Sequence, residues 1–144
     1  MAAQESLHVK TPLRDSMALS KLAGTSVFLK MDSSQPSGSF KIRGIGHLCK
    51  MKAKQGCRHF VCSSAGNAGM ATAYAARRLG IPATIVVPNT TPALTIERLK
   101  NEGATVEVVG EVSADPSWAG GLITRWRSSS SQSPRPAPPL ADAG

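Results

Sequence analysis

The chain has 144 residues, of which 41% are hydrophobic and only 4% aromatic, and it carries a formal net charge of +8. This length is sufficient for one domain with a core, which small and aliphatic side chains would have to fill. The sequence has no apolar leader after Met1 and no run of about 18 apolar residues, so we expect neither secretion nor membrane spanning. Three cysteines without paired metal-ligand spacing indicate reduced thiols and a cytoplasmic location.

The positive charge does not by itself indicate nucleic-acid binding. Lys50, Lys52 and Lys54 alternate along an expected helix, so their charges spread around it instead of forming a stripe. No aromatic residues interleave with them as a base-stacking platform requires. We therefore expect neither nucleic acid nor a membrane as a partner.

The N-terminal quarter of the chain predicts one short helix and one strand. After a turn at residues 11–13, Asp15 is placed to cap a helix that runs to Ala23 and ends at Gly24. Residues 27–31 then alternate between apolar and other side chains as a strand does.

From residue 42 onward the pattern alternates between helices and strands. Apolar spacing and terminal glycines predict helices at 42–55, 68–79 and from a Thr91 N-cap to Gly103. Short β-rich runs predict strands at 59–62, 83–87 and 105–109. The first helix would bury Ile42, Ile45, Leu48 and Cys49, with His47 as a half-buried structural histidine. This order predicts an α/β fold, a parallel sheet with helical crossovers.

Lys41 lies between a small-residue turn and the start of the first of these helices. Pro36, Ser37 and Gly38 are turn formers, and Ser39 is the expected N-cap. The positive end of the helix dipole disfavours an ammonium group, so Lys41 is a candidate for imine formation with a carbonyl cofactor. The alternative is a surface lysine whose amine is solvated.

The stretch Ser63 to Gly69 is a second small-residue loop, between a strand and a helix. Its backbone N–H groups, with the Ser64 and Asn67 side chains, are suited to bind an anion at the positive end of that helix. In a parallel sheet the loop would lie at the carboxyl ends of the strands, where ligands bind. The alternative is an ordinary crossover whose small residues only permit close packing of helix on sheet.

The two stretches together resemble a known family. Ser37-Gly-Ser-Phe-Lys-Ile-Arg-Gly44 followed by Ser63-Ser-Ala-Gly-Asn-Ala-Gly69 resembles the pyridoxal-phosphate enzymes of the tryptophan-synthase-β fold, or fold type II. Within that group the sequence Ser-Ala-Gly-Asn resembles the corresponding motif of the serine/threonine dehydratases and not that of the cysteine-synthase branch. The likeness extends from Leu7 to Gly110 and includes Thr11-Pro-Leu13 and Pro92-Ala-Leu-Thr-Ile-Glu97.

The resemblance implies roles for individual residues. Lys41 would carry pyridoxal 5'-phosphate as an imine, Phe40 would pack beside the ring, and Asn67 would hydrogen-bond its 3′ oxygen. Four consecutive residues would bind the substrate carboxylate: Ser64, Ala65, Gly66 and Asn67. Lys41, after release, would remove the Cα proton, with Ser64 as a second catalytic residue. The implied reaction is β-elimination from L-serine to pyruvate and ammonia, or from L-threonine to 2-oxobutanoate and ammonia. We expect no metal ligands here.

The likeness stops near Glu111, about one third of the way along a family member. The family's glycine-rich phosphate loop, the residue facing the pyridine nitrogen and the monovalent-cation site lie beyond that point. We therefore expect an N-terminal segment of a large domain (1–41), a small α/β domain (42–111) and a Ser/Pro-rich disordered tail (112–144).

The missing segments leave two functions open. The first is a truncated pyridoxal-phosphate-dependent ammonia-lyase that retains its cofactor weakly. The second is a catalytically inactive form that acts by binding full-length subunits, since members of the family form homodimers.

Overall fold

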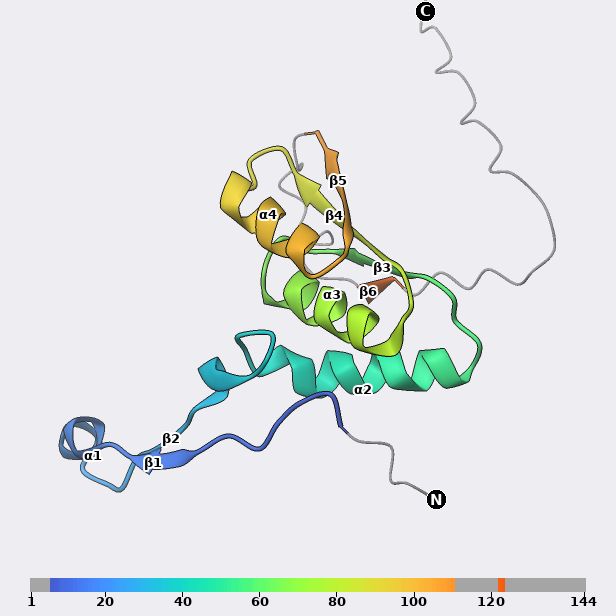
Figure 1. Ribbon diagram of the computed structural model, residues 1–144. Helices are drawn as coiled ribbons and strands as arrows, with labels where there is room; N and C mark the ends of the chain where they lie inside the picture. Colours follow the sequence, from blue (N-terminus) through green and yellow to red (C-terminus); the bar gives the residue numbers. More distant parts are fainter. Residues whose placement is uncertain (1–5, 111–121, 124–144) are drawn as a thin grey trace, which may run out of the picture.

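A computed structural model describes residues 6–110 and 122–123 (Figure 1). The elements in chain order are β1 (Leu13–Asp15), α1 (Met17–Ala23), β2 (Phe28–Lys30), a 3-10 turn η1 (Asp32–Ser34), α2 (Lys41–Lys54), β3 (Phe60–Ser63), α3 (Asn67–Leu79), β4 (Ala83–Pro88), α4 (Ala93–Asn101), β5 (Thr105–Val109) and β6 (Leu122–Ile123). No helix in this part of the chain is long and apolar enough to cross a membrane.

The main sheet has the strand order β5-β4-β3-β6. β3 pairs with β4, and β4 with β5, in parallel, so α3 and α4 are the crossovers between neighbouring strands. β6 pairs with the other edge of β3 in the antiparallel sense. The predicted α/β fold with a parallel sheet is therefore confirmed.

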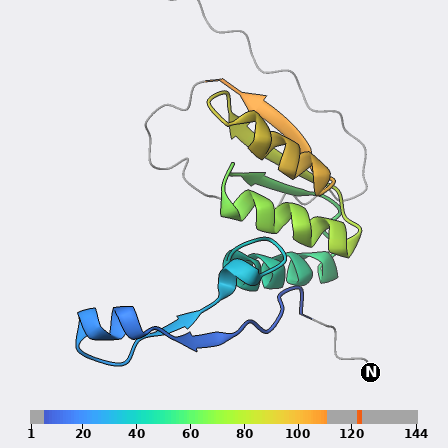
Figure 2. The same cartoon turned by 60° about the vertical axis from the view of Figure 1, so that its left-hand side comes forward.

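The core lies between this sheet and α3. Five of the six residues of β4 and seven of the thirteen residues of α3 are alanine, valine, isoleucine, threonine or glycine, and most of them are buried. Small side chains on α3 allow a close approach to the sheet, and α2 packs on the outer side of α3 (Figures 1 and 2). The largest side chains with almost no exposure are Phe60, Ile42, Ile85 and Leu99. Each contributes roughly 1.5–3 kcal/mol to folding.

Three helices end in the same way, at a left-handed glycine. Gly56, Gly80 and Gly103 have φ between 66° and 87°, a conformation that side chains with a Cβ rarely adopt. In each case the next N–H donates to the carbonyl five residues back, as in Ile81 to Ala76 at 3.0 Å. These stops confirm the predicted ends of the helices, and they turn the chain directly into the next strand.

The N-cap residues of α1 and α4, in contrast, were predicted wrongly. Asp15 belongs to β1, and Ser16 caps α1, with its Oγ accepting from the Leu19 N–H at 3.4 Å. Helix α4 begins after Pro92, which is its N-cap residue. The Thr91 hydroxyl is buried and has no hydrogen-bond partner among the described residues. Asp15 is unavailable as a cap because pairing between β1 and β2 fixes its backbone.

The N-terminal segment forms an arm, defined here as residues 13–30 (β1, α1 and β2). The two strands pair antiparallel, with Leu13 opposite Lys30, so the predicted turn at 11–13 continues as a strand. The predicted strand at 27–31 is present as β2. The arm projects away from the sheet and from α2 (Figures 1 and 2).

The face that α2 buries is narrower than the sequence pattern indicated. Ile42, Gly46 and Cys49 are buried, but Leu48 remains 36% exposed. His47 is also exposed, so its prediction as a half-buried structural histidine was wrong.

Two expectations about chain organisation stay predictions. The division at residue 41 into parts of two domains has no test in this fold. The disordered tail at 112–144 lies outside the described residues, apart from the two residues of β6.

Gly69 and Gly44 offer a matched pair of substitutions. A Cβ at Gly69 would overlap the backbone carbonyl oxygen of Ser64 and lie 3.2 Å from Cγ2 of Ile85, whereas a Cβ at Gly44 meets nothing within 4 Å. We expect Gly69→Ala to lower the free energy of unfolding by about 1–3 kcal/mol, because backbone must shift. Gly44→Ala should raise it by about 0.5–1 kcal/mol through helix propensity. Urea titration followed by circular dichroism measures both, and equal effects would contradict the packing described here.

Candidate active site

Lys41 is the first residue of α2. The turn before it needs Gly38, whose φ of 79° is left-handed. Ser39 is not the N-cap residue, because Phe40 takes that position with helical φ and ψ and the helix starts one residue later than the cap prediction. The Ser39 hydroxyl still accepts from the Lys41 N–H at 3.4 Å and satisfies a donor of the first turn. The local sequence therefore fixes the lysine backbone at the positive end of a helix.

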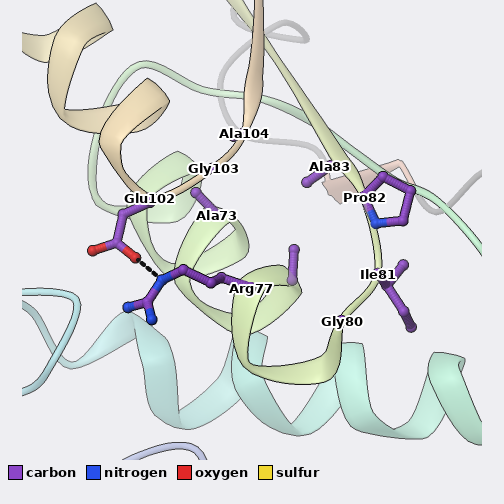
Figure 3. Close-up of a pocket in the computed structure, with 10 residues that line it drawn as sticks. Ala73, Arg77, Gly80, Ile81, Pro82, Ala83, Glu102, Gly103 and Ala104 are labelled. Carbon is purple, nitrogen blue, oxygen red and sulfur yellow. Dashed lines mark hydrogen bonds and ion pairs between the residues drawn. The ribbon is translucent and has the colours of Figure 1, made fainter.

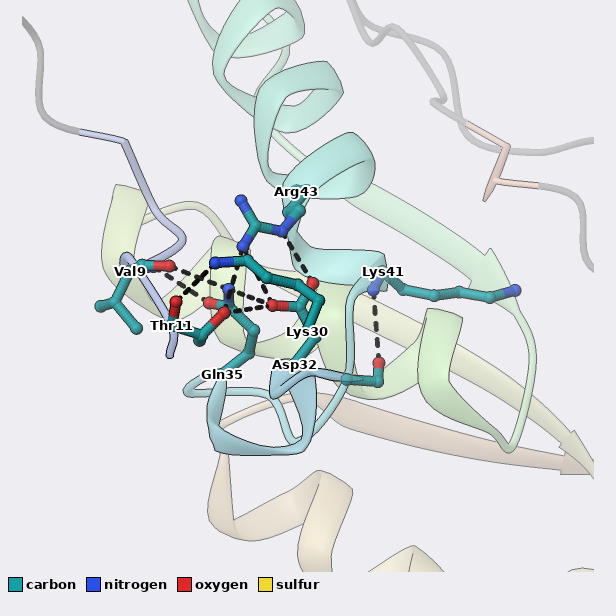
Figure 4. Close-up of polar contacts among 8 residues, drawn as sticks. Val9, Thr11, Lys30, Asp32, Gln35, Lys41 and Arg43 are labelled. Carbon is teal, nitrogen blue, oxygen red and sulfur yellow. Dashed lines mark hydrogen bonds and ion pairs between the residues drawn. The ribbon is translucent and has the colours of Figure 1, made fainter. Parts of the chain in front are cut away.

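The Lys41 side chain extends away from the polar cluster at the base of the arm (Figure 4). Within the described residues its amine has no hydrogen bond or ion pair. Its charge lies near the Cys62 thiol at the end of β3. Burial raises the pKa of that thiol, while a hydrogen bond from Thr72 and the charge of Lys41 lower it in part. The amine is therefore unengaged and directed toward the carboxyl end of the sheet.

An apolar cleft of about 460 Å³ lies beside the lysine. Its lining comes from the first half of α2 and the start of α3: Phe40, Lys41, Arg43, Gly44, Ile45, Leu48 and Ala68. Phe40 is 62% exposed, although it is an aromatic residue. The cleft brings the two predicted motifs together, since Lys41 belongs to one and Ala68 to the other.

The loop Ser64 to Asn67 connects β3 to α3 at the carboxyl end of the parallel strands. Ser64 Oγ accepts from the Gly66 N–H at 3.2 Å and so shapes the turn. Gly66 is the N-cap residue of α3, and no side chain caps this helix end. The first helical bond runs from the Met70 N–H to the Gly66 carbonyl at 3.1 Å. The N–H groups before Met70 therefore project from the end of the helix, as an anion site requires.

Two side chains of this loop are open to solvent. Asn67 is exposed and Ser64 half-buried, so both side chains are accessible. The described hydrogen bonds do not link Lys41 to Ser64 or to Asn67. The individual functions predicted for Phe40, Ser64 and Asn67 stay predictions.

A polar cluster that the sequence did not predict holds the start of α2 in place. We call Thr11, Asp32, Gln35 and Arg43 the clasp (Figure 4). Arg43 donates from Nε to Asp32 Oδ2 at 2.8 Å and from Nη2 to Asp32 Oδ1 at 2.9 Å. Thr11 Oγ1 donates to Asp32 Oδ1 at 2.6 Å. The carboxylate thus joins its own turn to two other chain segments, and one of these, α2, begins with Lys41, two residues before Arg43.

Gln35 extends the clasp to the segment before the arm. Its side-chain Nε2 donates to the Val9 carbonyl at 2.9 Å, and its Oε1 accepts from the Val9 N–H at 3.0 Å. The side-chain amide thus pairs with this backbone as a neighbouring strand would. Both side-chain and backbone groups of Gln35 are buried. Arg43 was part of the recognised motif, but its partner was not foreseeable, because Asp32 and Thr11 lie 11 and 32 residues before it.

The clasp also changes the protonation of its carboxyl group. The hydrogen bond from Arg43, followed by that from Thr11, holds the pKa of Asp32 well below its ordinary value, against a smaller effect of burial. The same interaction raises the pKa of Arg43. Asp32 is therefore ionised throughout the physiological range, and the bidentate ion pair persists there.

None of the three cysteines lines the cleft. All three are free and buried, which agrees with their prediction as reduced thiols. Burial, with smaller contributions from Cys62 and Cys57, raises the pKa of the Cys49 thiol to about 12. Such thiols are poor nucleophiles and metal ligands. No cluster of metal-ligating side chains occurs in the described part of the chain.

A second, smaller hollow of about 210 Å³ lies at the opposite end of the strands (Figure 3). Arg77 at the end of α3 donates to Glu102, before β5, at 2.9 Å across its rim. Its remaining walls are mostly alanine, glycine, proline and isoleucine. Ligands of parallel α/β sheets bind at the carboxyl ends, so this hollow is not the candidate site. The half-exposed ion pair contributes at most about 1 kcal/mol.

These features define a class of protein. A parallel α/β sheet presents, at its carboxyl end, an unengaged lysine at one helix start and an uncapped helix N-terminus in a small-residue loop. That combination is typical of an enzyme that holds a carbonyl compound through the lysine and an anion through the loop.

Comparison with known proteins specifies the family. The family model described as pyridoxal-phosphate dependent enzyme matches residues 5–128. L-serine dehydratase/L-threonine deaminase of Mus musculus is 99% identical over 112 residues, which are 78% of this chain and 34% of that protein. The human serine dehydratase-like protein is 63% identical over 111 residues, 77% of this chain and 34% of that protein. The chain belongs to the family of pyridoxal-phosphate-dependent enzymes.

Solved structures agree with this assignment. The L-serine ammonia-lyase of Rhizomucor miehei has a TM-score of 0.66 and 38% identity, with 74% of this chain and 34% of that chain covered. Maize serine racemase has a TM-score of 0.66 and 32% identity, with 73% and 32% covered. The chain thus spans about a third of the length of the relatives that it matches.

The described residues fit part of this cofactor. Lys41 supplies an unengaged amine, and the Ser64–Asn67 loop presents N–H groups at the start of α3 that no side chain caps. A cofactor phosphate needs a further set of N–H donors. The other strand-to-helix loop of the parallel sheet, residues 89–92, contains no glycine. The fit therefore covers the covalent attachment and one anion, and the described residues offer no second glycine-rich loop.

Acid should weaken the clasp. Because the pKa of Asp32 is lower in the folded state than its ordinary value of 3.8, its contribution to stability is nearly complete above about pH 5 and is lost progressively as the pH falls. Asp32→Asn should unfold at a lower urea concentration than the parent chain at pH 7. This difference should shrink between pH 4 and pH 2. A difference that stayed constant down to pH 2 would show that the ionised carboxylate is not the stabilising form.

Proposed function

We propose that this chain carries the lysine and the carboxylate-binding loop of a pyridoxal-phosphate-dependent L-serine/L-threonine dehydratase. The observation that carries the proposal is the shared cleft, in which the Lys41 motif meets the first turn of α3. The names of the similar mammalian proteins specify L-serine and L-threonine as the substrates of those proteins. Their near identity over the matched residues extends the same substrate class to this chain.

Each group in the site has a task in such a reaction. The uncapped N–H groups of the Ser64–Asn67 loop would bind the substrate carboxylate, and the side chains of Ser64 and Asn67 would orient it. Lys41 Nζ would hold the cofactor and then take the proton from Cα. When bound, pyridoxal phosphate supplies the electron sink that makes this proton acidic. Phe40 would cover the cofactor ring from the side of the cleft.

The reaction would then release the β-hydroxyl group of the substrate. Loss of the Cα proton and of the hydroxyl from serine, followed by addition of water and loss of ammonia, gives pyruvate. The same sequence on threonine gives 2-oxobutanoate. We place this chemistry in the cytoplasm, because the three free thiols suit a reducing compartment.

The chain by itself should retain the cofactor weakly. Charge-assisted hydrogen bonds to a phosphate contribute typically about 1.5–3 kcal/mol each, and the described residues offer no second set of donors for them. We therefore expect the complete reaction to require the segments of the longer relatives that lie outside the matched stretch.

Reductive trapping tests the proposal on the chain itself. We expect incubation with substoichiometric pyridoxal phosphate and then borohydride to label Lys41 several-fold more than Lys54, which is exposed at the far end of α2. Mass spectrometry of the digested protein measures both labels. Without borohydride, gel filtration should remove most of the cofactor, and serine should yield little pyruvate.

Two variants provide the control. Lys41→Arg should lose the preferred label, whereas Lys54→Arg should keep it. Labelling spread evenly over the lysines would overturn the assignment of Lys41. Tight retention with rapid pyruvate formation would instead show that the missing segments are unnecessary.

A further inference from the structure

The smaller hollow lies between the last turn of α3, the start of β4 and the turn from α4 into β5, away from the Lys41 cleft (Figure 3). Its volume is about 210 Å³. Pockets for drug-sized ligands span roughly 300–1,000 Å³, so this hollow suits a smaller molecule. Six of the residues that line it are alanine or glycine, and these leave the space open: Ala73, Ala76, Gly80, Ala83, Gly103 and Ala104.

The walls of the hollow are apolar, and the N–H groups at its edge are already used. Those of Gly80 and Ile81 donate to carbonyls in the last turn of α3, at 3.2 and 3.0 Å. Those of Gly103 and Ala104 donate to carbonyls of α4, at 2.8 and 3.2 Å. A hydroxyl group placed against these walls would lose hydrogen bonds to water without replacement. The hollow therefore favours an apolar group.

Two opposite charges stand at the rim of this apolar space. Arg77 Nε donates to Glu102 Oε2 at 2.9 Å (Figure 3). Within the described residues this is the one hydrogen bond of the guanidinium group, so its two terminal amino groups are available to a carboxylate. The second carboxylate oxygen of Glu102 is available in the same way to an ammonium group.

Neighbouring groups hold both charges in place. The guanidinium carbon of Arg77 lies 5.4 Å from the centroid of the Tyr74 ring, which attracts a cation. Tyr74 is buried, and its hydroxyl accepts from Arg78 Nη1 at 3.0 Å, so the ring itself is fixed. The Glu102 N–H donates to the Arg98 carbonyl at 3.2 Å, which fixes the backbone there. The two charges are therefore preorganised, and a ligand loses less entropy in ordering them.

The ion pair at the rim can be replaced at little cost. The side chain of Arg77 is 50% exposed and that of Glu102 is 22% exposed, and ion pairs in contact with water add little to stability. A ligand with a carboxylate for Arg77 and an ammonium group for Glu102 supplies each side chain with an equivalent partner. A simple anion would instead be repelled by Glu102, and a simple cation by Arg77. The charges at the rim therefore complement a zwitterion.

We propose that this hollow is a binding site for a free α-amino acid with a small apolar side chain. The α-carboxylate binds Arg77, the α-ammonium group binds Glu102, and the side chain lies against the alanine walls. The walls discriminate against hydroxyl-bearing amino acids, such as the serine and threonine in the names of the similar mammalian proteins. The site is separate from the Lys41 cleft, and the proposal does not rest on the proposed function.

Nuclear magnetic resonance on the isotope-labelled full chain tests the site without a cofactor. The probe is L-2-aminobutanoate, which has a methyl group where L-serine has its hydroxyl. We expect saturable shifts of the Gly80 and Gly103 amide signals, with a Kd in the millimolar range. L-Serine should bind there at least threefold more weakly. Butanoate, which lacks the amino group, and propylamine, which lacks the carboxylate, should each bind at least fivefold more weakly.

Two pairs of variants assign the contacts. Arg77→Gln and Glu102→Gln should each weaken the binding of L-2-aminobutanoate at least fivefold, because each removes one charge-assisted contact. Arg98→Gln and Glu97→Gln make the same changes of charge at exposed positions of α4 outside the hollow, and they should alter the Kd less than twofold. None of the four positions is buried, so circular dichroism should show the folded spectrum of the parent chain for every variant.

Three outcomes would overturn the amino-acid site. They are the absence of saturable shifts at Gly80 and Gly103, binding of butanoate or propylamine as tight as that of the amino acid, and equal losses in the two pairs of variants. Shifts confined to Gly66 and Gly69, at the other end of α3, count as such an absence. Amino-acid binding in the hollow although borohydride labels the lysines evenly contradicts the proposed function alone. Preferential labelling of Lys41 without that binding contradicts the amino-acid site alone.

Discussion

The carboxylate of Asp32 is the interaction on which the geometry of this chain depends. It accepts from Arg43 in the first turn of α2 and from Thr11 before the arm, and η1 joins the two through Asp32 itself. Hydrogen bonds from several donors stabilise the ionised form of the carboxyl group, and the pKa of Asp32 is low for this reason. Because Arg43 is two residues after Lys41, the same bonds fix the backbone of the lysine. Removing the carboxylate would therefore leave Lys41 on a helix start with one constraint fewer.

The other half of the site depends on packing. Gly69 lets the first turn of α3 lie directly against the Ser64 carbonyl, so the loop can fold over the helix end and leave its N–H groups unobstructed. Alanines further along α3 keep the helix close to β3 and β4. The rigid sheet then determines where the loop lies relative to α2. The position of the anion-binding loop at the carboxyl end of the sheet thus depends on the small side chains of α3 in the core.

Local signals in the sequence were sufficient for the α/β fold and for the two motifs. Terminal glycines such as Gly80 and β-rich runs such as 83–87 act over a few residues, so they could be read from the sequence alone. The errors came from long-range pairing. The β1–β2 ladder removed Asp15 from its predicted cap, and the clasp joins residues up to 32 positions apart. His47 and Leu48 were predicted to be buried because helical periodicity identifies the apolar face of a helix. It does not show how much of that face the neighbouring helix covers.

The three buried cysteines are internal probes of how often the core of this protein opens. Thiolates react and thiols do not, and burial keeps the Cys49 and Cys62 sulfurs protonated inside the core. A disulfide reagent in solution reaches them only when helix and sheet separate. The rate of thiol modification in dilute reagent therefore reports how often the core around these cysteines becomes exposed to solvent.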